Sequence, residues 1–137
     1  MFVKPSSSFW RLAPAMPFAT SFYLDRRLII TRAWGHITVA DVRAYQQELG
    51  QRPEFDPTWA HVFDARDAVQ FDISRDEIRQ LAETSVFTPW ARRAMVATDS
   101  AVFGRFRMYG ALFENQVDGS AVGVFTTLGD AIEWVTP

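Results

Sequence analysis

The sequence predicts an α/β fold in which helices cover a mostly parallel sheet that begins with an antiparallel hairpin. β-like apolar stretches alternate with helix-like stretches in the order ββαβαβαβα, which is typical of parallel sheets. Three of the points where a strand gives way to a helix share a Ser or Thr followed three residues later by an acid: Thr38 with Asp41, Ser74 with Glu77, and Thr127 with Asp130. Such a hydroxyl accepts a hydrogen bond from a free amide of the first helical turn, and the acid can reach back to the amide of the capping residue. These signatures predict where three of the helices begin.

The strands are predicted from short apolar stretches bounded by turn residues. Residues 20–24 and 28–34 form a hairpin around Asp25-Arg26-Arg27. Residues 59–64 form a strand dense enough in apolar side chains to lie inside a covered sheet. Two further buried strands are predicted at residues 93–98 and 121–126.

The helices are predicted from apolar residues at helical spacing. Their expected spans are residues 38–49, 74–87, 99 or 100 to 113, and 128–135. The expected buried stripes of the first three helices are Val42, Tyr45 and Leu49; Ile78, Leu81, Ala82 and Val86; and Val102, Phe106, Tyr109 and Phe113. Gly50 and Pro89 are the expected terminators of the first two.

The length of 137 residues suits one domain, which we place at residues 20–137. Residues 1–19 are expected to be a tail, because their prolines and serines suit neither helix nor strand. Met16 is an alternative start to Met1, which would make the first fifteen residues an upstream extension.

The amino-acid composition excludes several classes of protein and of functional site. A hydrophobic fraction of 48% excludes a disordered chain, and a net charge of −2 gives no general attraction to nucleic acid or anionic membrane. The absence of cysteine excludes disulfides, thiol catalysis and thiolate metal sites. We find no apolar run long enough for a transmembrane helix or a secretory signal, and we therefore expect a cytoplasmic protein.

Several short segments resemble the STAS-like, SpoIIAA-like group of small bacterial domains. The resemblance extends over residues 20–135 and depends on the order and spacing of these segments: Trp34-Gly35-His36-Ile37-Thr38, Val62-Phe63-Asp64, Arg93-Ala94-Met95-Val96-Ala97, Gly104-Arg105-Phe106-Arg107-Met108, Val124-Phe125 and Asp130-Ala131-Ile132-Glu133-Trp134-Val135. It implies a mixed sheet packed by helices. It implies little about activity, because many members have no established role and one fold supports many functions.

The resemblance makes Ser74 a phospho-acceptor candidate. In the anti-sigma-factor antagonists that give this fold its name, a partner kinase phosphorylates a Ser at the start of the second helix, in a motif similar to Asp-Ser-Ser-Gly. Here the motif reads Asp72-Ile73-Ser74-Arg75, at a helix start where amides and the helix dipole favour a phosphate. However, Arg75 replaces the glycine, and Asp76-Glu77 would repel an added dianion. Ser74 is thus primarily a helix cap, with a phosphorylation switch as the alternative.

The helix over residues 102–113 is the second candidate surface, because it carries more apolar side chains than one core-facing stripe requires. Gly104 and Gly110 within it suggest close packing or a segment able to move. One interpretation is a core helix with a dimer contact. The other is a hydrophobic ligand groove, or a face that touches a partner or a membrane, with arginines meeting an acidic headgroup. The ligand- or partner-binding candidates are Phe103, Phe106, Arg107, Met108 and Tyr109.

The sequence contains few combinations of residues that could form a catalytic site. His61 and Asp64 lie three apart in a strand, so they point to opposite faces and form no simple dyad. His36 suits a solvated or capping role beside a helix start. The cluster of Asp64, Arg66 and Asp67 suits a solvated or salt-bridged loop. However, Asp64 and Asp99 are placed where parallel strands of open α/β sheets end and ligands bind, which keeps an enzyme as an alternative.

The leading hypothesis is a non-catalytic STAS-like module that binds a protein partner or a small hydrophobic, lipid-like ligand. A regulatory switch at Ser74 and an enzyme using carboxylates at the C-terminal edge of the sheet are the alternatives. No cofactor is expected, and two histidines without cysteine give little basis for zinc, although carboxylates could bind a hard cation. Isolated Arg26-Arg27 and Arg92-Arg93 pairs are too small for a nucleic-acid footprint. The aromatic content is compatible with a homodimer, and any membrane contact would be peripheral.

Overall fold

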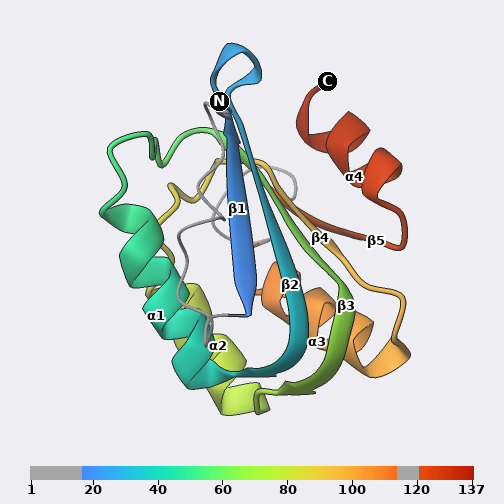
Figure 1. The fold of residues 1–137 in the computed structure, drawn as a ribbon. Coiled ribbons are helices and arrows are strands. Elements are labelled where there is room, and N and C mark those ends of the chain that lie inside the picture. The colour runs from blue at the N-terminus through green and yellow to red at the C-terminus, as the bar shows by residue number, and fades with distance from the viewer. Residues whose placement is uncertain (1–16, 114–120) are drawn as a thin grey trace, which may run out of the picture.

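The computed structural model describes residues 17–113 and 121–137. Its elements are the strands β1 (Phe18–Tyr23), β2 (Leu28–Thr38), β3 (Ala60–Asp72), β4 (Arg93–Val96) and β5 (Val122–Phe125), the 3-10 turn η2 (Leu24–Arg26), and the helices α1 (Val39–Gly50), α2 (Arg75–Glu83), α3 (Ser100–Ala111) and α4 (Leu128–Val135). The sheet has the order β1-β2-β3-β4-β5 (Figure 1), with β1 antiparallel to β2 and all other pairs parallel. The predicted fold class and element order are confirmed.

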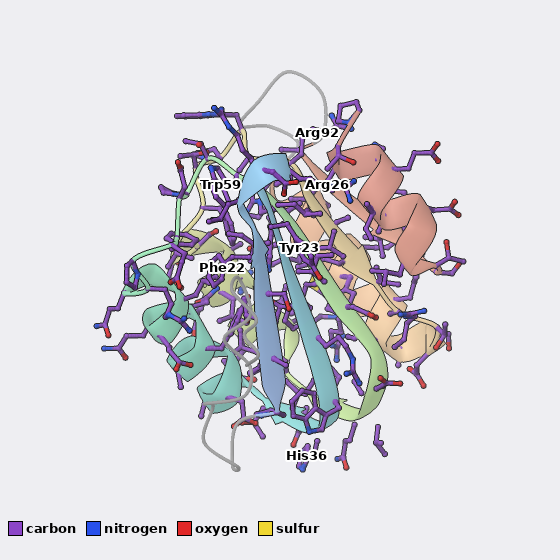
Figure 2. The ribbon with its side chains drawn as sticks, turned by 45° about the horizontal axis from the view of Figure 1, so that its top comes forward. Phe22, Tyr23, Arg26, His36, Trp59 and Arg92 are labelled. Atoms are coloured by element: carbon purple, nitrogen blue, oxygen red, sulfur yellow. The ribbon has the colours of Figure 1, made fainter. Side chains whose placement is uncertain are left out.

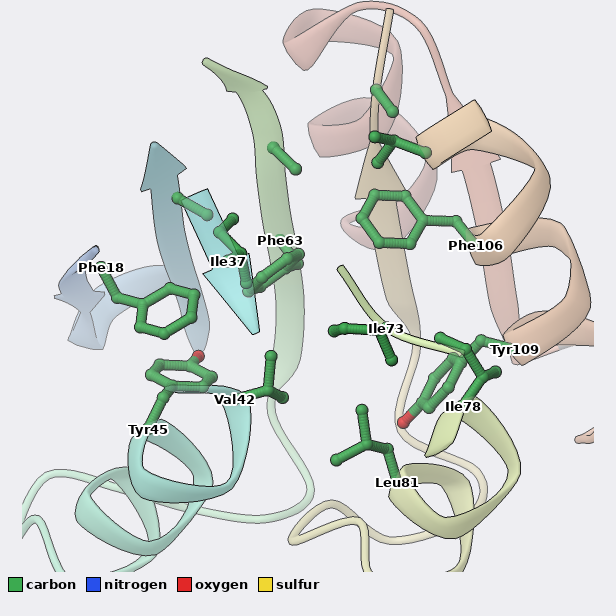
Figure 3. Packing of buried hydrophobic residues seen from close by; sticks show 14 of the residues in the cluster. Phe18, Ile37, Val42, Tyr45, Phe63, Ile73, Ile78, Leu81, Phe106 and Tyr109 are labelled. Atoms are coloured by element: carbon green, nitrogen blue, oxygen red, sulfur yellow. The ribbon is translucent and has the colours of Figure 1, made fainter. Parts of the chain in front are cut away.

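The sheet separates two hydrophobic cores, because successive side chains of a strand point to opposite faces. α1 and α4 lie on opposite sides of the sheet (Figure 1). The larger core, which contains Phe18, Phe63 and Phe106, packs against α1, α2 and α3. The smaller core, which contains Val62 and Ala131, lies under α4. The larger core is where the predicted helical stripes meet, as Figure 3 shows for side chains of α1, α2 and α3.

Side-chain caps start each α-helix. Thr38 and Ser74 form reciprocal capping boxes with Asp41 and Glu77, as the sequence predicts. Thr127 caps α4 by accepting a hydrogen bond from the amide of Asp130 at 3.2 Å. Asp99 is the N-cap of α3, which decides between the two predicted caps of that helix.

The third strand is much longer than predicted. It continues to Asp72, whereas the sequence placed its end at Asp64. The extension exists because β2 is also long: Trp34 pairs with Asp67, and Thr38 pairs with Asp72. The prediction of a loop at Asp64-Ala65-Arg66-Asp67 is therefore wrong, because pairing with a distant strand holds these polar residues in the sheet.

The second helix is shorter than predicted. α2 ends at Glu83, whereas the apolar spacing extended it to Phe87. Thr84 is the C-cap, and its amide and its hydroxyl both donate to the carbonyl of Gln80, each at 3.2 Å. The next residues line the interior: the Oγ of Ser85 accepts a hydrogen bond from the amide of Phe87 at 3.2 Å.

At the N-terminal side, β1 begins at Phe18, two residues before the predicted start of the domain, and Phe18 is fully buried. The rest of the predicted tail, including Met1 and Met16, lies in residues 1–16, which are outside the described residues.

Candidate functional site

A cavity of about 70 Å³ lies between the sheet and the three helices of the larger core. Its walls come from α1, α2, α3, β3, β4 and the segment that joins α2 to β4. Apolar and aromatic side chains form most of the lining, including Leu49, Phe63, Ile78, Leu81 and Met95. The polar lining residues are Tyr45, Gln46, His61, Ser85, Arg93 and Tyr109. An apolar pocket with a few converging polar groups is the usual form of a small-molecule site.

One polar wall of the cavity is a buried hydrogen-bond network across the sheet. The hydroxyl of Thr31 lies 2.6 Å from the Tyr45 hydroxyl and 3.1 Å from His61 Nε2. Tyr45 and His61 also contact each other at 3.1 Å, and Thr20 joins through Thr31 at 3.2 Å. The ring of His61 stacks on Phe87 with centroids 4.7 Å apart. These contacts fix both polar rings against the cavity.

The other polar wall centres on Arg93, which is only 2% exposed. Its Nε donates to the carbonyl of Ala91 at 3.2 Å, and its Nη1 donates to Ser85 Oγ at 3.1 Å. The guanidinium lies over Phe113, 4.3 Å from the ring centroid. Its Nη2 is buried and has no hydrogen-bond partner. None of the ion pairs between described residues includes Arg93.

Burial sets the charges around the cavity. Desolvation, with the nearby charge of Arg93, lowers the pKa of His61 to about 3, so His61 is neutral at pH 7. Burial raises the pKa of Tyr45, and it also raises the pKa of Tyr109 against the opposing effects of Arg93 and Ser85. Burial lowers the pKa of Arg93, but an Arg remains charged in proteins. The cavity wall therefore carries one positive charge beside neutral polar groups.

The structure divides the five candidate residues of α3. Phe106 and Tyr109 are buried and line the cavity, and both project inward from α3 in Figure 3. Phe103 and Met108 are half-buried and pack against the larger core. Arg107 is exposed. The five candidates therefore do not form one surface, and only Phe106 and Tyr109 line the cavity.

Ser74 is exposed at the start of α2, on the helix that supplies Ile78 and Leu81 to the cavity. Its Oγ accepts from the amide of Glu77 at 3.2 Å, and its own amide donates to Glu77 Oε1 at 2.9 Å. The helix-cap interpretation of Ser74 is confirmed. Phosphorylation at this residue stays a prediction.

The carboxylates considered for catalysis hold structural contacts. Arg66 donates two side-chain hydrogen bonds of 2.8 Å to Asp64, one to each carboxylate oxygen. Burial alone would raise the pKa of Asp64, but these bonds and the charges of Arg66 and Arg32 hold it below its usual value. Asp99 Oδ1 accepts the amides of Ala101 at 2.9 Å and Val102 at 3.1 Å.

The strand position of Asp64 differs from the prediction, whereas Asp99 follows the end of β4 as expected. Asp64 lies level with Val96 at the end of β4, but its own strand continues for eight more residues. The placement of Asp64 at a strand end is therefore wrong. His61 and Asp64 have opposite orientations in β3, as predicted: His61 lines the cavity, whereas Asp64 pairs with Val96 of the smaller core.

The remaining histidine is remote from the cavity. His36 lies at the other end of the sheet from Tyr23 and Arg26 (Figure 2) and 3.8 Å from Asp72 Oδ2. Among the described residues, no group of three or more His, Asp or Glu is arranged to hold a metal ion. No helix in the described part of the chain is long and apolar enough to cross a membrane.

Sequence reasoning missed Arg93 and Ser85 as parts of a site. The sequence places Arg93 at the start of a buried strand, but its side chain was weighed only as half of the Arg92-Arg93 pair against nucleic-acid binding. Its position in the strand was the available signal. Arg93 directly precedes the apolar segment Ala94-Met95-Val96-Ala97, and it lies two residues before Met95, which faces the cavity. Residues two apart in a strand point to the same face, so Arg93 also points inward. Ser85 gave no signal, because the predicted helix ran through it.

The sheet order and the helices on its two faces define the class of this chain: it has a SpoIIAA-like α/β fold. A solved structure of an uncharacterized DUF3478 family protein from Shewanella loihica PV-4, with a SpoIIAA-like fold, matches 90% of this chain and 98% of its own with a TM-score of 0.58. The sequence identity is 14%, so the likeness concerns the fold. No family model matches the sequence, and the search of curated proteins finds no significant match.

Proposed function

We propose that this chain is a non-catalytic binding module that takes a small, mainly apolar molecule into the cavity between the sheet and α1, α2 and α3. The observation that carries the proposal is the cavity itself, with its aromatic and aliphatic lining and its few fixed polar groups. Apolar walls supply affinity through the hydrophobic effect, and the polar groups orient the bound molecule.

The cavity is small, and one of its walls is the segment that joins α2 to β4. An engineered protein cavity of ~150 Å³ takes benzene, so a cavity of about 70 Å³ suits a group of a few heavy atoms. Ser85, Val86 and Phe87 line the cavity from a segment without regular secondary structure. Movement of this segment would admit a longer molecule with its polar end inside.

The alternative functions have less support. The carboxylates of Asp64 and Asp99 are occupied by structural hydrogen bonds, which disfavours an enzyme built on them.

A switch at Ser74 would act on the same cavity, because α2 carries both Ser74 and cavity-lining residues. Phosphopeptide mapping of protein from its own host tests it, and a modified serine elsewhere would count against Ser74. The partner-binding and homodimer predictions are tested by the oligomeric state and co-purified proteins of the same material.

Native mass spectrometry of the protein purified from its own host tests the proposal. We expect a bound small molecule whose mass disappears when the protein is denatured. Leu81→Phe should reduce the bound fraction, because Leu81 lines the cavity and a larger side chain fills it. The matched control is Leu128→Phe, the same substitution at the first residue of α4, which packs against the smaller core.

The two variants separate cavity binding from other binding. Equal bound fractions in Leu81→Phe and Leu128→Phe would show that the molecule lies elsewhere. Ligand-free protein in repeated preparations would contradict the proposal.

A further inference from the structure

We propose that the molecule taken into the cavity is a compact carboxylic acid, held by the guanidinium of Arg93. This inference rests on the proposed function and names the chemical class of its ligand. It follows from the charge, the hydrogen bonding and the surroundings of Arg93.

Arg93 has a buried charge without a counter-charge among the described residues. It is 2% exposed, and its hydrogen bonds to described residues go to the carbonyl of Ala91 and to the hydroxyls of Ser85 and Tyr109, all of them neutral. A buried charge without an ionised partner is strongly unfavourable, and proteins usually pair it. An apolar side chain at this position would avoid that cost, so the retained charge points to a ligand that neutralises it.

The free hydrogen-bonding capacity of Arg93 fits one anionic group. Nη2 is buried and without a partner, whereas Nε and Nη1 are occupied. Guanidinium nitrogens bind carboxylate oxygens with strong, charge-assisted hydrogen bonds. The hydroxyls of Ser85 and Tyr109 also line the cavity and interact with each other and with Arg93. Both hydroxyls can turn to accept or donate, so the second carboxylate oxygen has a hydrogen-bond donor nearby.

The remaining surroundings select against a larger charge. His61, the partner of Arg93 in the strand pairing, is neutral because of its lowered pKa and adds no second positive charge. Most of the other lining residues are apolar, with Phe63, Met95 and Phe106 among them. A doubly charged phosphate would be poorly solvated there, whereas a monoanion with a short apolar body matches both parts of the cavity.

Binding of butanoate and of 1-butanol, followed by NMR titration at pH 7, tests this inference. The two probes have similar apolar chains and differ in charge. For the unsubstituted protein we expect butanoate to bind at least ten times more tightly than 1-butanol. Arg93→Gln should reduce that ratio to about one by weakening butanoate alone.

Arg92→Gln is the matched control, because it removes the neighbouring guanidinium. Arg92 donates to the carbonyl of Trp134 at 2.8 Å, lies over the Trp134 ring and does not line the cavity. It should therefore preserve the preference for butanoate. Inorganic phosphate, as a third probe, should not shift the signals of cavity residues.

The outcomes separate the inference from the proposed function. Equal binding of butanoate and 1-butanol to the unsubstituted protein would show that Arg93 does not select a carboxylate, and would overturn the inference while leaving the proposed function. Phosphate binding as tight as that of butanoate would indicate a general anion site and would also overturn it. Absence of binding by either organic probe would overturn the inference, whereas the proposed function is decided by the native mass spectrometry described above. The comparison of probes on the unsubstituted protein stands even if Arg93→Gln fails to fold.

Discussion

Lowering the pH from 7 to 5 should destabilise the protein through His61. In the folded protein, burial and Arg93 lower the pKa of His61 to about 3. In the unfolded chain a histidine has its ordinary pKa of about 6.5. The unfolded state therefore binds a proton that the folded state rejects as the pH falls below about 6.5, and stability is lost from there down towards pH 3. Each pH unit in this window costs about 1.4 kcal/mol, so the loss between pH 7 and pH 5 is about 2 kcal/mol.

Urea unfolding at pH 7 and pH 5, followed by tryptophan fluorescence, measures this loss. The control variant is His61→Gln, which can keep a hydrogen bond to Thr31 or Tyr45 but does not titrate. We expect the free energy of unfolding to fall by about 2 kcal/mol more in the unsubstituted protein than in the variant. His36 is present in both proteins, so any contribution from it cancels. Equal losses in the two proteins would refute the neutral, buried state of His61.

Five further substitutions test the cap of α2, the larger core and the left-handed backbone conformation of Gly35 in β2. Ser74→Ala should lower the free energy of unfolding by about 1 kcal/mol through loss of the N-cap, and Ser74→Asp should restore most of it; no change in Ser74→Ala would contradict the capping role. Phe106→Ala should cost about 3–5 kcal/mol by thermal or urea unfolding, because Phe106 is 2% exposed in the larger core; a cost below 1 kcal/mol would contradict its packing. Gly35→Ala should cost about 1 kcal/mol, because Gly35 has a φ of 72° and its Cβ would meet no atom within 4 Å, so only backbone strain remains. Gly104→Ala is its matched control: it also finds open space but lies in α3, so it should stabilise the protein by about 1 kcal/mol, and the same sign for both would be inconsistent with this reasoning.

The local parts of the fold could be predicted from the sequence. Thr38 and Ser74 signal their helices through residues only three positions away, so no tertiary information is needed. The same holds for the buried stripe of α1, whose members Val42, Tyr45 and Leu49 follow the helical period. Features that depend on distant pairing were missed. The polar second half of β3 resembles a loop until its pairing with β2 is known.

The candidate site was predicted only in part for the same reason. Phe106 and Tyr109 were identified because an aromatic-rich helix is visible in the sequence. The combination of His61, Ser85 and Arg93 was not, because these residues come from two strands and an irregular segment that only the fold brings together. A charged side chain at an inward position of a buried strand, such as Arg93 in β4, is the sequence signal that indicates a buried polar site.

The cavity, and not the outer surface of α3, should bind the small molecule. Intermolecular nuclear Overhauser effects between butanoate and protein methyl groups test it most directly. We predict contacts from the butanoate chain to the methyl groups of Ile78, Leu81 and Met95, all of which line the cavity. Contacts confined to exposed methyl groups, such as those of Val69, which is 86% exposed, would contradict the claim.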